Sequence, residues 1–335
     1  MGHSPVTDVH LSRNWGATLS ELCSGYERVL ILVSPGGRER GTLNAAQHAL
    51  KDRETMVLPP APVNPTVKQL VDLYGDANLQ DFQAIVAVGG GSVIDSAKAV
   101  ALARSSTSAA DFETRLVTAS PSSNLCDFDV VAVPTTAGTG SEVTPFATIW
   151  DTENMKKRSI SGDYLQPKHA ILDPSLLKSL RGDSLLFPTL DAVSHAIESL
   201  WSKNATPQSR LHAATALSLL SQAIGACLTQ DPDFARLSLG SLYAGLAIAQ
   251  SRTAIAHSMS YPLTLRFGVP HGLACSFTLS AIHNHLSDRL GNYCQEIDLI
   301  QGVLDEVQAL NLGERIRSYL VLADAQNFVH EMLTP

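Results

Sequence analysis

The chain has 335 residues, of which 44% are hydrophobic and 17% charged, and its formal net charge is −8. This length allows two domains with buried cores, and the composition is that of a globular protein. A net negative chain without a dense block of lysine and arginine is a poor candidate for binding nucleic acid or an anionic membrane. An anionic substrate would have to be held by local basic groups.

The five cysteines are scattered, and no pair has C-x-x-C spacing. This argues against a disulfide framework and against a cysteine-based zinc site. The first residues, MGHSPVTDVHLSRNWG, lack the apolar core of a signal peptide. No apolar run is expected to reach membrane-spanning length. We therefore expect a soluble protein of the reducing cytoplasm.

Up to about residue 173, short apolar segments alternate with helical ones. Strands are predicted at 28–33, 55–59, 82–91 and 129–136, and helices at 42–51, 66–75 and 92–104. Apolar, β-branched runs that alternate with helices indicate a parallel sheet covered on both faces. We expect an α/β domain over residues 1–173.

The second half has a different character. Segments that begin at Asp191, Ser209 and Phe234 are long, rich in alanine and leucine, and helical in period. We expect a helical domain over residues 174–335, joined to the first domain near Asp173 and Pro174.

Two polar turns follow predicted strands. The first, AVGGGSVIDSAK, places Gly89, Gly90, Gly91 and Ser92 between a strand and a helix. Glycine allows close backbone approach, and a helix N-terminus offers free N–H groups to a phosphate. The spacing is not G-x-G-x-x-G, so a tight turn explains this loop equally well.

The second turn, VPTTAGTGSEVTP, supplies the hydroxyls of Thr135, Thr136, Thr139 and Ser141. Hydroxyls and amides at the carboxyl ends of strands suit a dinucleotide cofactor. The two loops together favour nucleotide binding.

Four side chains form a candidate metal site. Asp191 and His195 are four residues apart, which places them on one face of a helix. Alone, this pair would be an ordinary surface contact. His257 and His271 add two more imidazoles, and such a set binds Fe²⁺ or Zn²⁺. Four protein ligands plus a substrate oxygen exceed the tetrahedral geometry that is usual for zinc, which favours Fe²⁺.

Pro262, Gly268 and Pro270 lie between His257 and His271, so no single straight helix connects the two histidines. We expect these residues to break the chain and turn His271 back toward His257. His283 and His285 are weaker candidates for lining the site. The remaining histidines are expected at the surface or in packing: His3, His10, His48, His169, His212 and His330.

The segments GGGSVIDSAKA, PTTAGTGSEVT, LDAVSHAIES and HSMSYPL…FGVPHGLA stand in this order along the chain. In these segments the chain resembles the iron-dependent (group III) alcohol dehydrogenases over nearly its whole length. The resemblance implies the fold shared with dehydroquinate synthase, with a doubly wound N-terminal domain and an all-helical C-terminal domain, usually assembled as a homodimer. It implies the metal ligands Asp191, His195, His257 and His271. It implies nicotinamide-cofactor contacts at Gly89 to Ser92, Asp95, Thr135, Thr136 and Ser141.

The chain departs from the family pattern at two places. Many members have a second histidine four residues after the third ligand, where this chain has Tyr261. Many also end the first strand with an aspartate that holds the adenosine ribose. Here LVSPGGRERG offers Arg38 and Arg40 instead. An arginine accommodates the 2′-phosphate of NADP, so we expect NADPH to be preferred over NADH.

Within the family, VTPFATIWDTENMKKRSIS, SHAIESLWSKNATP and TAIAHSMSYPLT…HGLACSFTL most resemble phosphonoacetaldehyde reductases. This resemblance implies metal-assisted hydride transfer to phosphonoacetaldehyde, which gives 2-hydroxyethylphosphonate. Tyr261 is expected to donate a hydrogen bond to the phosphonate, unless its ring only packs beside Pro262. The candidate cationic partners are Lys157, Arg158, Lys203 and Arg252, with Lys157 and Tyr261 as the candidate catalytic side chains.

Other functions stay open at this stage. A general short-chain alcohol dehydrogenase or a maleylacetate reductase would use the same fold. A lyase of the dehydroquinate synthase type would keep its cofactor bound, and steady NAD(P)H consumption with simple aldehydes would exclude it. A non-catalytic cofactor-binding protein would not need the full set of metal ligands.

Overall fold

In the computed structural model, residues 6–119, 128–290 and 296–320 are described. His3, Cys126, Cys294 and His330 lie outside these residues. The chain forms two compact units. The first comprises Met1–Thr135 and Ser141–Leu176, and the second comprises Thr136–Gly140 and Leu177–Pro335.

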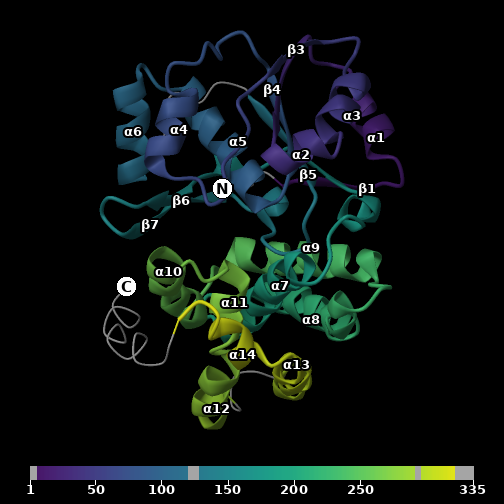
Figure 1. Cartoon of the computed structure of the whole chain (residues 1–335), viewed down its shortest axis with the longest axis vertical. Coiled ribbons are helices and arrows are strands. Elements are labelled where there is room, and N and C mark those ends of the chain that lie inside the picture. Colours follow the sequence, from purple (N-terminus) through teal and green to yellow (C-terminus); the bar gives the residue numbers. More distant parts are fainter. Residues whose placement is uncertain (1–5, 120–127, 291–295, 321–335) are drawn as a thin grey trace. The chain divides into compact units, whose positions relative to one another are not determined.

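The first unit is built on a six-stranded parallel sheet, shown in Figure 1. Its strand order is β1-β8-β5-β4-β2-β3. The strands are β1 (Asp8–Leu11), β2 (Arg28–Val33), β3 (Glu54–Val57), β4 (Ala84–Gly89), β5 (Asp129–Pro134) and β8 (His169–Leu172). The chain passes outward from β2 to β3 and returns on the other side of β2 as β4. The sheet is therefore doubly wound, as expected, with its switch point between β2 and β4.

Side chains of the central strands alternate between two apolar cores. Leu30 and Leu32 of β2 pack with helices α4 (Val67–Tyr74), α5 (Gly91–Arg104) and α6 (Ala109–Thr118). Their neighbours Val29, Ile31 and Val33 pack with α1 (Trp15–Leu22) and α3 (Thr42–Ala49). Because both faces of the sheet are covered, the strands appear in the sequence as continuous apolar runs.

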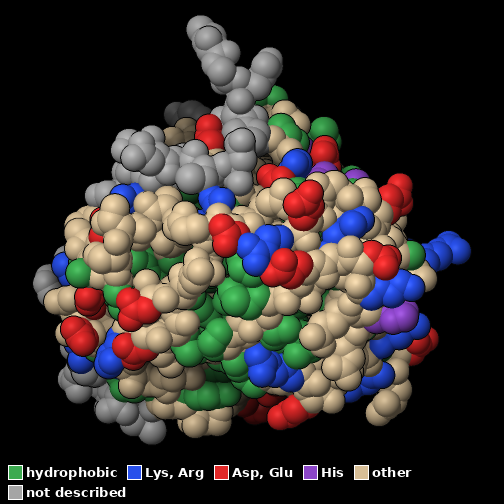
Figure 2. All heavy atoms as spheres, turned by 90° about the horizontal axis from the view of Figure 1, so that it is seen from above, with side chains coloured by type: hydrophobic (Ala, Val, Ile, Leu, Met, Phe, Trp, Pro, Cys, Tyr) green, Lys and Arg blue, Asp and Glu red, His purple; other side chains and the backbone are tan. Residues whose placement is uncertain are grey.

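Shorter elements complete the first unit. Helix α2 (Pro35–Glu39) follows β2, and an antiparallel hairpin is formed by β6 (Phe146–Asp151) and β7 (Lys156–Ser161). Single 3₁₀ turns are η1 (Ser141–Val143), η2 (Asp163–Leu165) and η3 (Pro174–Leu177). On the face shown in Figure 2, lysine and arginine side chains are interspersed with aspartate and glutamate.

The second unit is helical in its described residues. Its helices are α7 (Asp183–Trp201), α8 (Pro207–Ser221), η4 (Gly225–Leu228), α9 (Phe234–Ser251), α10 (Ile255–Phe267), α11 (His271–Ser276), α12 (Leu279–Leu290), α13 (Ile297–Ala309) and α14 (Leu312–Ile316). Helix α7 is buried along most of its length and packs against α8, α9 and α11. Polar residues on α7 therefore need partners inside the protein.

Two helix boundaries differ from the sequence prediction. Pro262 lies inside α10 and does not end it. A proline removes one hydrogen bond from a helix, and tertiary packing can hold the helix together. The chain instead bends at Gly268, where φ is 66°, and at Pro270. The long helical segment that begins at Phe234 is also divided, because Arg252 has a φ of 64° and ends α9.

One stretch corrects the expectation that no apolar run could span a membrane. Residues Pro207–Leu228 are long and apolar enough by length and composition, with a mean hydropathy of 1.4. However, Ala213, Ala216, Leu217 and Leu220 belong to the buried core of the helical unit. A helix that is buried in a protein core also meets these criteria of length and composition.

Candidate functional site

One face of α7 carries three buried acid–base side chains. Asp191, His195 and Glu198 follow one another at spacings of four and three residues, so they share one side of the helix. Asp191 and His195 were expected as metal ligands, and Glu198 was not expected to have a role. The spacing in LDAVSHAIE was the signal that could have identified Glu198.

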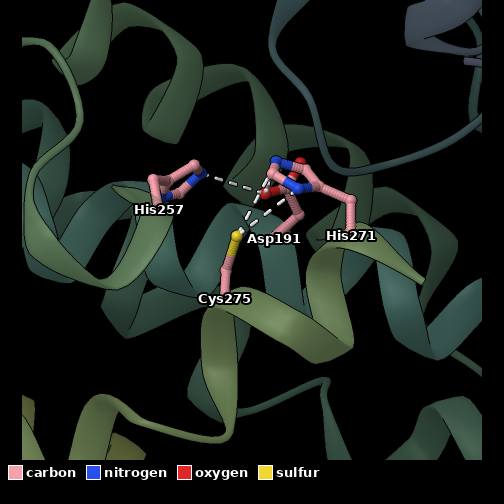
Figure 3. A group of neighbouring side chains, drawn as sticks. All are labelled: Asp191, His257, His271 and Cys275. Atoms are coloured by element: carbon pink, nitrogen blue, oxygen red, sulfur yellow. Dashed lines mark hydrogen bonds and ion pairs between the residues drawn. The ribbon is translucent and has the colours of Figure 1, made fainter. Parts of the chain in front are cut away.

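Helices α10 and α11 bring the other two predicted ligands to the same place. The Oδ1 atom of Asp191 lies 3.3 Å from Nε2 of His257 and 3.5 Å from Nε2 of His195. It lies 3.7 Å from Nε2 of His271. Figure 3 shows His257 and His271 on either side of the Asp191 carboxylate. The structure therefore groups the four predicted ligands around one oxygen atom.

The donor atoms of this group fit a bound divalent cation. Among the described residues, Asp191 Oδ1 and His257 Nε2, which face each other, are buried without a hydrogen-bond partner, and unpaired buried polar atoms are costly. Metal–ligand bonds of about 2.0–2.2 Å at tetrahedral angles separate two ligand atoms by about 3.3–3.6 Å. The observed separations lie close to this range, and they are long for good hydrogen bonds.

Glu198 holds His257 in one orientation. Its carboxylate accepts hydrogen bonds from the backbone N–H of Ala256 at 2.6 Å and of His257 at 3.3 Å. The other carboxylate oxygen pairs with Nδ1 of His257. This arrangement turns Nε2 toward Asp191, and with a metal bound to Nε2 the remaining proton would stay on Nδ1, as in the carboxylate–histidine–metal arrangements of metalloenzymes.

The protonation states of two groups suit metal binding. Burial raises the pKa of Asp191, but the opposite effect of His195, His271 and His257 is larger. The net pKa lies below the usual value, so the carboxyl stays ionised at neutral pH. Burial lowers the pKa of His195 to about 4, which keeps this imidazole neutral. Ionised carboxylates and neutral imidazoles are the forms that bind metals.

Gly272 allows α11 to approach α7. A Cβ atom at this position would lie 1.9 Å from the carbonyl oxygen of Phe187 and 3.0 Å from the backbone nitrogen of Asp191. Only glycine permits this backbone contact. Because His271 precedes Gly272, the contact sets its imidazole beside Asp191.

A further side chain of α11 joins the group. Cys275 is buried, and its Sγ lies within 4.8 Å of the ligand atoms of Asp191, His257 and His271. Burial raises the pKa of its thiol, but His257 and His271 lower it to about 7. The sequence interpretation considered cysteines only in C-x-x-C patterns and missed it. Its position four residues after His271 was the available signal.

Tyr261 lies beside the metal-binding group. It is four residues after His257 on α10, and its ring stacks on that of His271 with a centroid distance of 6.5 Å and an interplanar angle of 14°. His283 instead stacks on Trp201, with ring centroids 6.1 Å apart, and His285 is exposed.

The predicted cofactor residues lie at the carboxyl ends of β4 and β5. Gly89 ends β4, and a Cβ there would lie 2.3 Å from the side chain of Val93. Gly90 is the N-cap residue of α5, and no side chain caps this end of the helix. The first backbone N–H groups of α5 are the kind of donors that bind a phosphate. Asp95 accepts a hydrogen bond from the backbone N–H of Thr148 at 2.9 Å. Ser92 accepts one from the backbone N–H of Asn64 at 3.1 Å.

The second loop predicted to contact the cofactor is divided between the two units. Thr135 and Ser141 belong to the first unit, and Thr136 and Thr139 to the second. A Cβ at Gly138 would lie 2.4 Å from the carbonyl oxygen of Pro188, and one at Gly140 would lie 2.4 Å from Cα of Gly245. The segment 136–140 therefore packs on α7 and α9.

A buried lysine that the sequence interpretation did not single out supports the residues after this loop. Lys98 of α5 donates hydrogen bonds to the carbonyl oxygens of Thr144 at 2.7 Å and Phe146 at 2.8 Å. Burial lowers its pKa to about 8, against the opposing influence of Asp95 and Glu142. Lys98 thus fixes the chain between η1 and β6.

The expected cationic partners of the substrate belong to different units. Lys157 and Arg158 lie on β7 in the first unit, where Arg158 forms a 2.7 Å ion pair with Asp151. Lys203 and Arg252 belong to the helical unit and are exposed. Arg38 is exposed in α2, and it donates a hydrogen bond to the carbonyl oxygen of Leu58 at 2.9 Å.

Comparison with known families identifies the class. Residues 7–174 match the family described as iron-containing alcohol dehydrogenase, and residues 187–325 match the C-terminal domain of the Fe-containing alcohol dehydrogenase family. The chain belongs to the iron-containing alcohol dehydrogenase family, which confirms the resemblance seen in its sequence.

Among individual proteins, the chain is similar to phosphonoacetaldehyde reductase of Streptomyces viridochromogenes. The two are 38% identical over 272 residues, which cover 77% of this chain and 67% of the relative. The chain is 30% identical over 215 residues to 4-hydroxybutyrate dehydrogenase of Clostridium kluyveri, covering 63% of this chain and 56% of the relative.

Solved structures share the fold. An iron-containing alcohol dehydrogenase of Thermotoga maritima matches with a TM-score of 0.83 and 25% identity, covering 100% of this chain and 92% of that chain. Sulfoacetaldehyde reductase of Bifidobacterium kashiwanohense in complex with NAD⁺ matches with a TM-score of 0.84 and 24% identity, over the same shares.

Proposed function

We propose that this protein is a metal-dependent, NADPH-linked reductase that converts phosphonoacetaldehyde to 2-hydroxyethylphosphonate. The carrying observation is the group in which one imidazole nitrogen each of His195, His257 and His271 lies 3.3–3.7 Å from Asp191 Oδ1, since that oxygen and His257 Nε2 are buried without a hydrogen-bond partner among the described residues. The substrate rests on the 38% identity to phosphonoacetaldehyde reductase.

The chain's own residues provide position and charge. When bound, Fe²⁺ or Zn²⁺ would polarise the aldehyde oxygen, and the nicotinamide would supply the hydride. Asp191 and the three imidazoles hold the metal, and Glu198 orients His257. Gly89 to Ser92, with Asp95, Thr135, Thr136, Thr139 and Ser141, bind the cofactor.

NADPH is proposed from the segment after β2. On this fold an acidic residue near the end of that strand binds the ribose 2′-hydroxyl of NAD, whereas an arginine accommodates the 2′-phosphate of NADP. Here Ser34 caps α2, and Arg38 extends from that helix. A higher kcat/KM with NADH than with NADPH would refute this part of the proposal.

Tyr261 and Arg252 are proposed to recognise the phosphonate. The ring of Tyr261 stacks on that of His271, so its phenol can donate a hydrogen bond beside the metal ligands. Arg252 has φ 64° and ψ 170°, a conformation used almost only by glycine, and it lies five residues before His257. Strained backbone of this kind is concentrated at functional sites. Lys157, Arg158 and Lys203 are the other candidate cations.

The test compares two aldehydes. Tyr261→Phe should lower kcat/KM for phosphonoacetaldehyde about tenfold to a hundredfold, because a charge-assisted hydrogen bond contributes roughly 1.5–3 kcal/mol. Arg252→Gln should also lower kcat/KM for phosphonoacetaldehyde. Both variants should change kcat/KM for lactaldehyde, which is uncharged, much less. Glu306→Gln, an exposed change on α13, is the control.

Three outcomes would contradict parts of this assignment. Equal losses on both aldehydes would mean that Tyr261 serves the chemistry and not phosphonate recognition. No loss on either would mean that its ring only packs. Turnover of lactaldehyde but not of phosphonoacetaldehyde would make the protein a general alcohol dehydrogenase.

A further inference from the structure

The sulfur atom of Cys275 lies beside the imidazole of His271. It lies 3.7 Å from Nδ1 and 3.7 Å from Nε2 of His271. Equal distances place it on the plane that bisects the two nitrogens, away from the lone-pair axis of either. Hydrogen bonds are strongest along that axis, so the two contacts with His271 are weak ones.

The distance does agree with a shared metal ion. Bonds of about 2.3 Å to a thiolate and about 2.0–2.1 Å to an imidazole, at the angles of about 90–120° of a five-coordinate ion, separate sulfur and nitrogen by about 3.1–3.8 Å. Figure 3 shows the sulfur directed from α11 toward Asp191 and His271. Asp191 Oδ1 and His257 Nε2, two buried atoms without partners among the described residues, belong to the same group.

The other described cysteines show what a structural cysteine looks like in this protein. Cys23 lies in an apolar core of the first unit, and Cys227 lies in the apolar core of the helical unit. Cys227 also has a local partner, because its thiol is 3.7 Å from Oγ1 of Thr189. Buried cysteines usually behave as such small hydrophobic residues. Cys275 is as deeply buried, but its neighbours are a carboxylate and two imidazoles.

We propose that Cys275 is an additional ligand of the metal held by Asp191, His195, His257 and His271, and that it binds as a thiolate. This inference rests on the proposed metal-dependent function and adds a sulfur donor to its ligand set. The thiol proton passes to solvent when the metal binds. A thiolate is a soft donor, so its loss should weaken the binding of Zn²⁺ more than the binding of Fe²⁺.

Cobalt provides a spectroscopic test that does not depend on activity. The full-length protein is stripped of metal with a chelator and titrated anaerobically with CoCl₂. Visible d–d bands report that Co²⁺ is bound, and a near-ultraviolet thiolate-to-cobalt charge-transfer band reports that sulfur is a ligand. Cys275→Ser is compared with the wild type, and Cys227→Ser is the matched control, because it removes a buried thiol from the same unit.

The inference expects both kinds of band in the wild type and in Cys227→Ser. Cys275→Ser should keep d–d bands, since four ligands remain, and should lose the charge-transfer band. The dissociation constant of Cys275→Ser for Zn²⁺ should be about tenfold or more above that of the wild type. Its dissociation constant for Fe²⁺ should rise by a smaller factor.

The two proposals fail in different ways. Cobalt d–d bands without a charge-transfer band in the wild type would overturn the thiolate ligand and leave the metal site intact. A charge-transfer band that persists in Cys275→Ser would assign the sulfur ligand to another cysteine. This result would also overturn the proposed role of Cys275. Absence of all cobalt bands from the wild type would refute the metal-dependent function itself.

Discussion

At the scale of single residues, a substitution of Glu198 can test whether this buried acid supports the metal site through its contact with His257. Glu198→Gln keeps a side chain that can hydrogen-bond but removes the negative charge beside the imidazole. Metal affinity should fall about ten- to a hundredfold, as it does when such supporting carboxylates are lost. Competition with a chromophoric chelator measures it, with His271→Ala as the variant expected to lose more. An affinity equal to that of the exposed control Glu306→Gln would contradict the role.

The sequence predicted the residues whose chemistry has a recognisable type and spacing. Asp191, His195, His257 and His271 stand in motifs, and the structure brings them together. Glu198 and Cys275 could not be predicted in the same way. A glutamate or a cysteine on a helix is common, and only the approach of α10 and α11 to α7 gives these two a metal-binding group as neighbour.

At the scale of elements, the approach of α11 to α7 depends on Gly272. Gly272→Ala would place a methyl group against the carbonyl oxygen of Phe187. The helices must then separate, which should lower the stability by about 1–3 kcal/mol and weaken metal binding through His271. Gly302→Ala is the matched control, because a Cβ there, on α13, meets nothing within 4 Å. That change should stabilise by about 0.5–1 kcal/mol. Equal urea midpoints for the two variants would contradict the close contact.

Lys98 should make the stability depend on pH in the alkaline range. Burial lowers the pKa of its ammonium group from 10.5 to about 8. Between these two values the unfolded chain binds more protons than the folded chain, so stability should rise with pH through this window. Urea unfolding at pH 8 and pH 10 measures the increment. Lys98→Met is less stable at both values, because two carbonyl groups lose their partner, and it should show a smaller increment. The same increment in both proteins would exclude Lys98 as its source.

Elements with their own apolar pattern were predicted well, and elements made by pairing were not. β2, β4 and β5 are continuous apolar runs, and their bounds lie close to the predicted ones. β1 has the sequence DVHL, and its register is set by β8, more than 150 residues away. β7, KKRSIS, is mostly polar and is a strand because it pairs with β6. Such pairing energy cannot be seen in a local pattern.

At the scale of the whole molecule, metal and cofactor should protect different units. The metal-binding group lies within the helical unit, whereas Gly89 to Ser92 and Arg38 lie in the α/β unit. A ligand that binds only the folded state stabilises the structure that forms its site. In amide hydrogen exchange, Zn²⁺ alone should protect peptides of α7, α10 and α11. NADPH alone should protect those of α2 and the start of α5. Protection of α5 but not α7 by Zn²⁺ would contradict the placement of the metal.

The division of residues 135–141 has a consequence for the order in which the protein can be assembled during synthesis. The chain leaves the first unit after Thr135, contributes five residues to the second and returns at Ser141. Their packing partners, Pro188 and Gly245, are translated later. A nascent chain that ends at residue 176 thus contains every strand of the sheet but lacks the two backbone positions, Pro188 and Gly245, against which Gly138 and Gly140 pack. Since domains fold as they emerge from the ribosome, the loop of residues 136–140 can complete its packing only after about seventy more residues have followed.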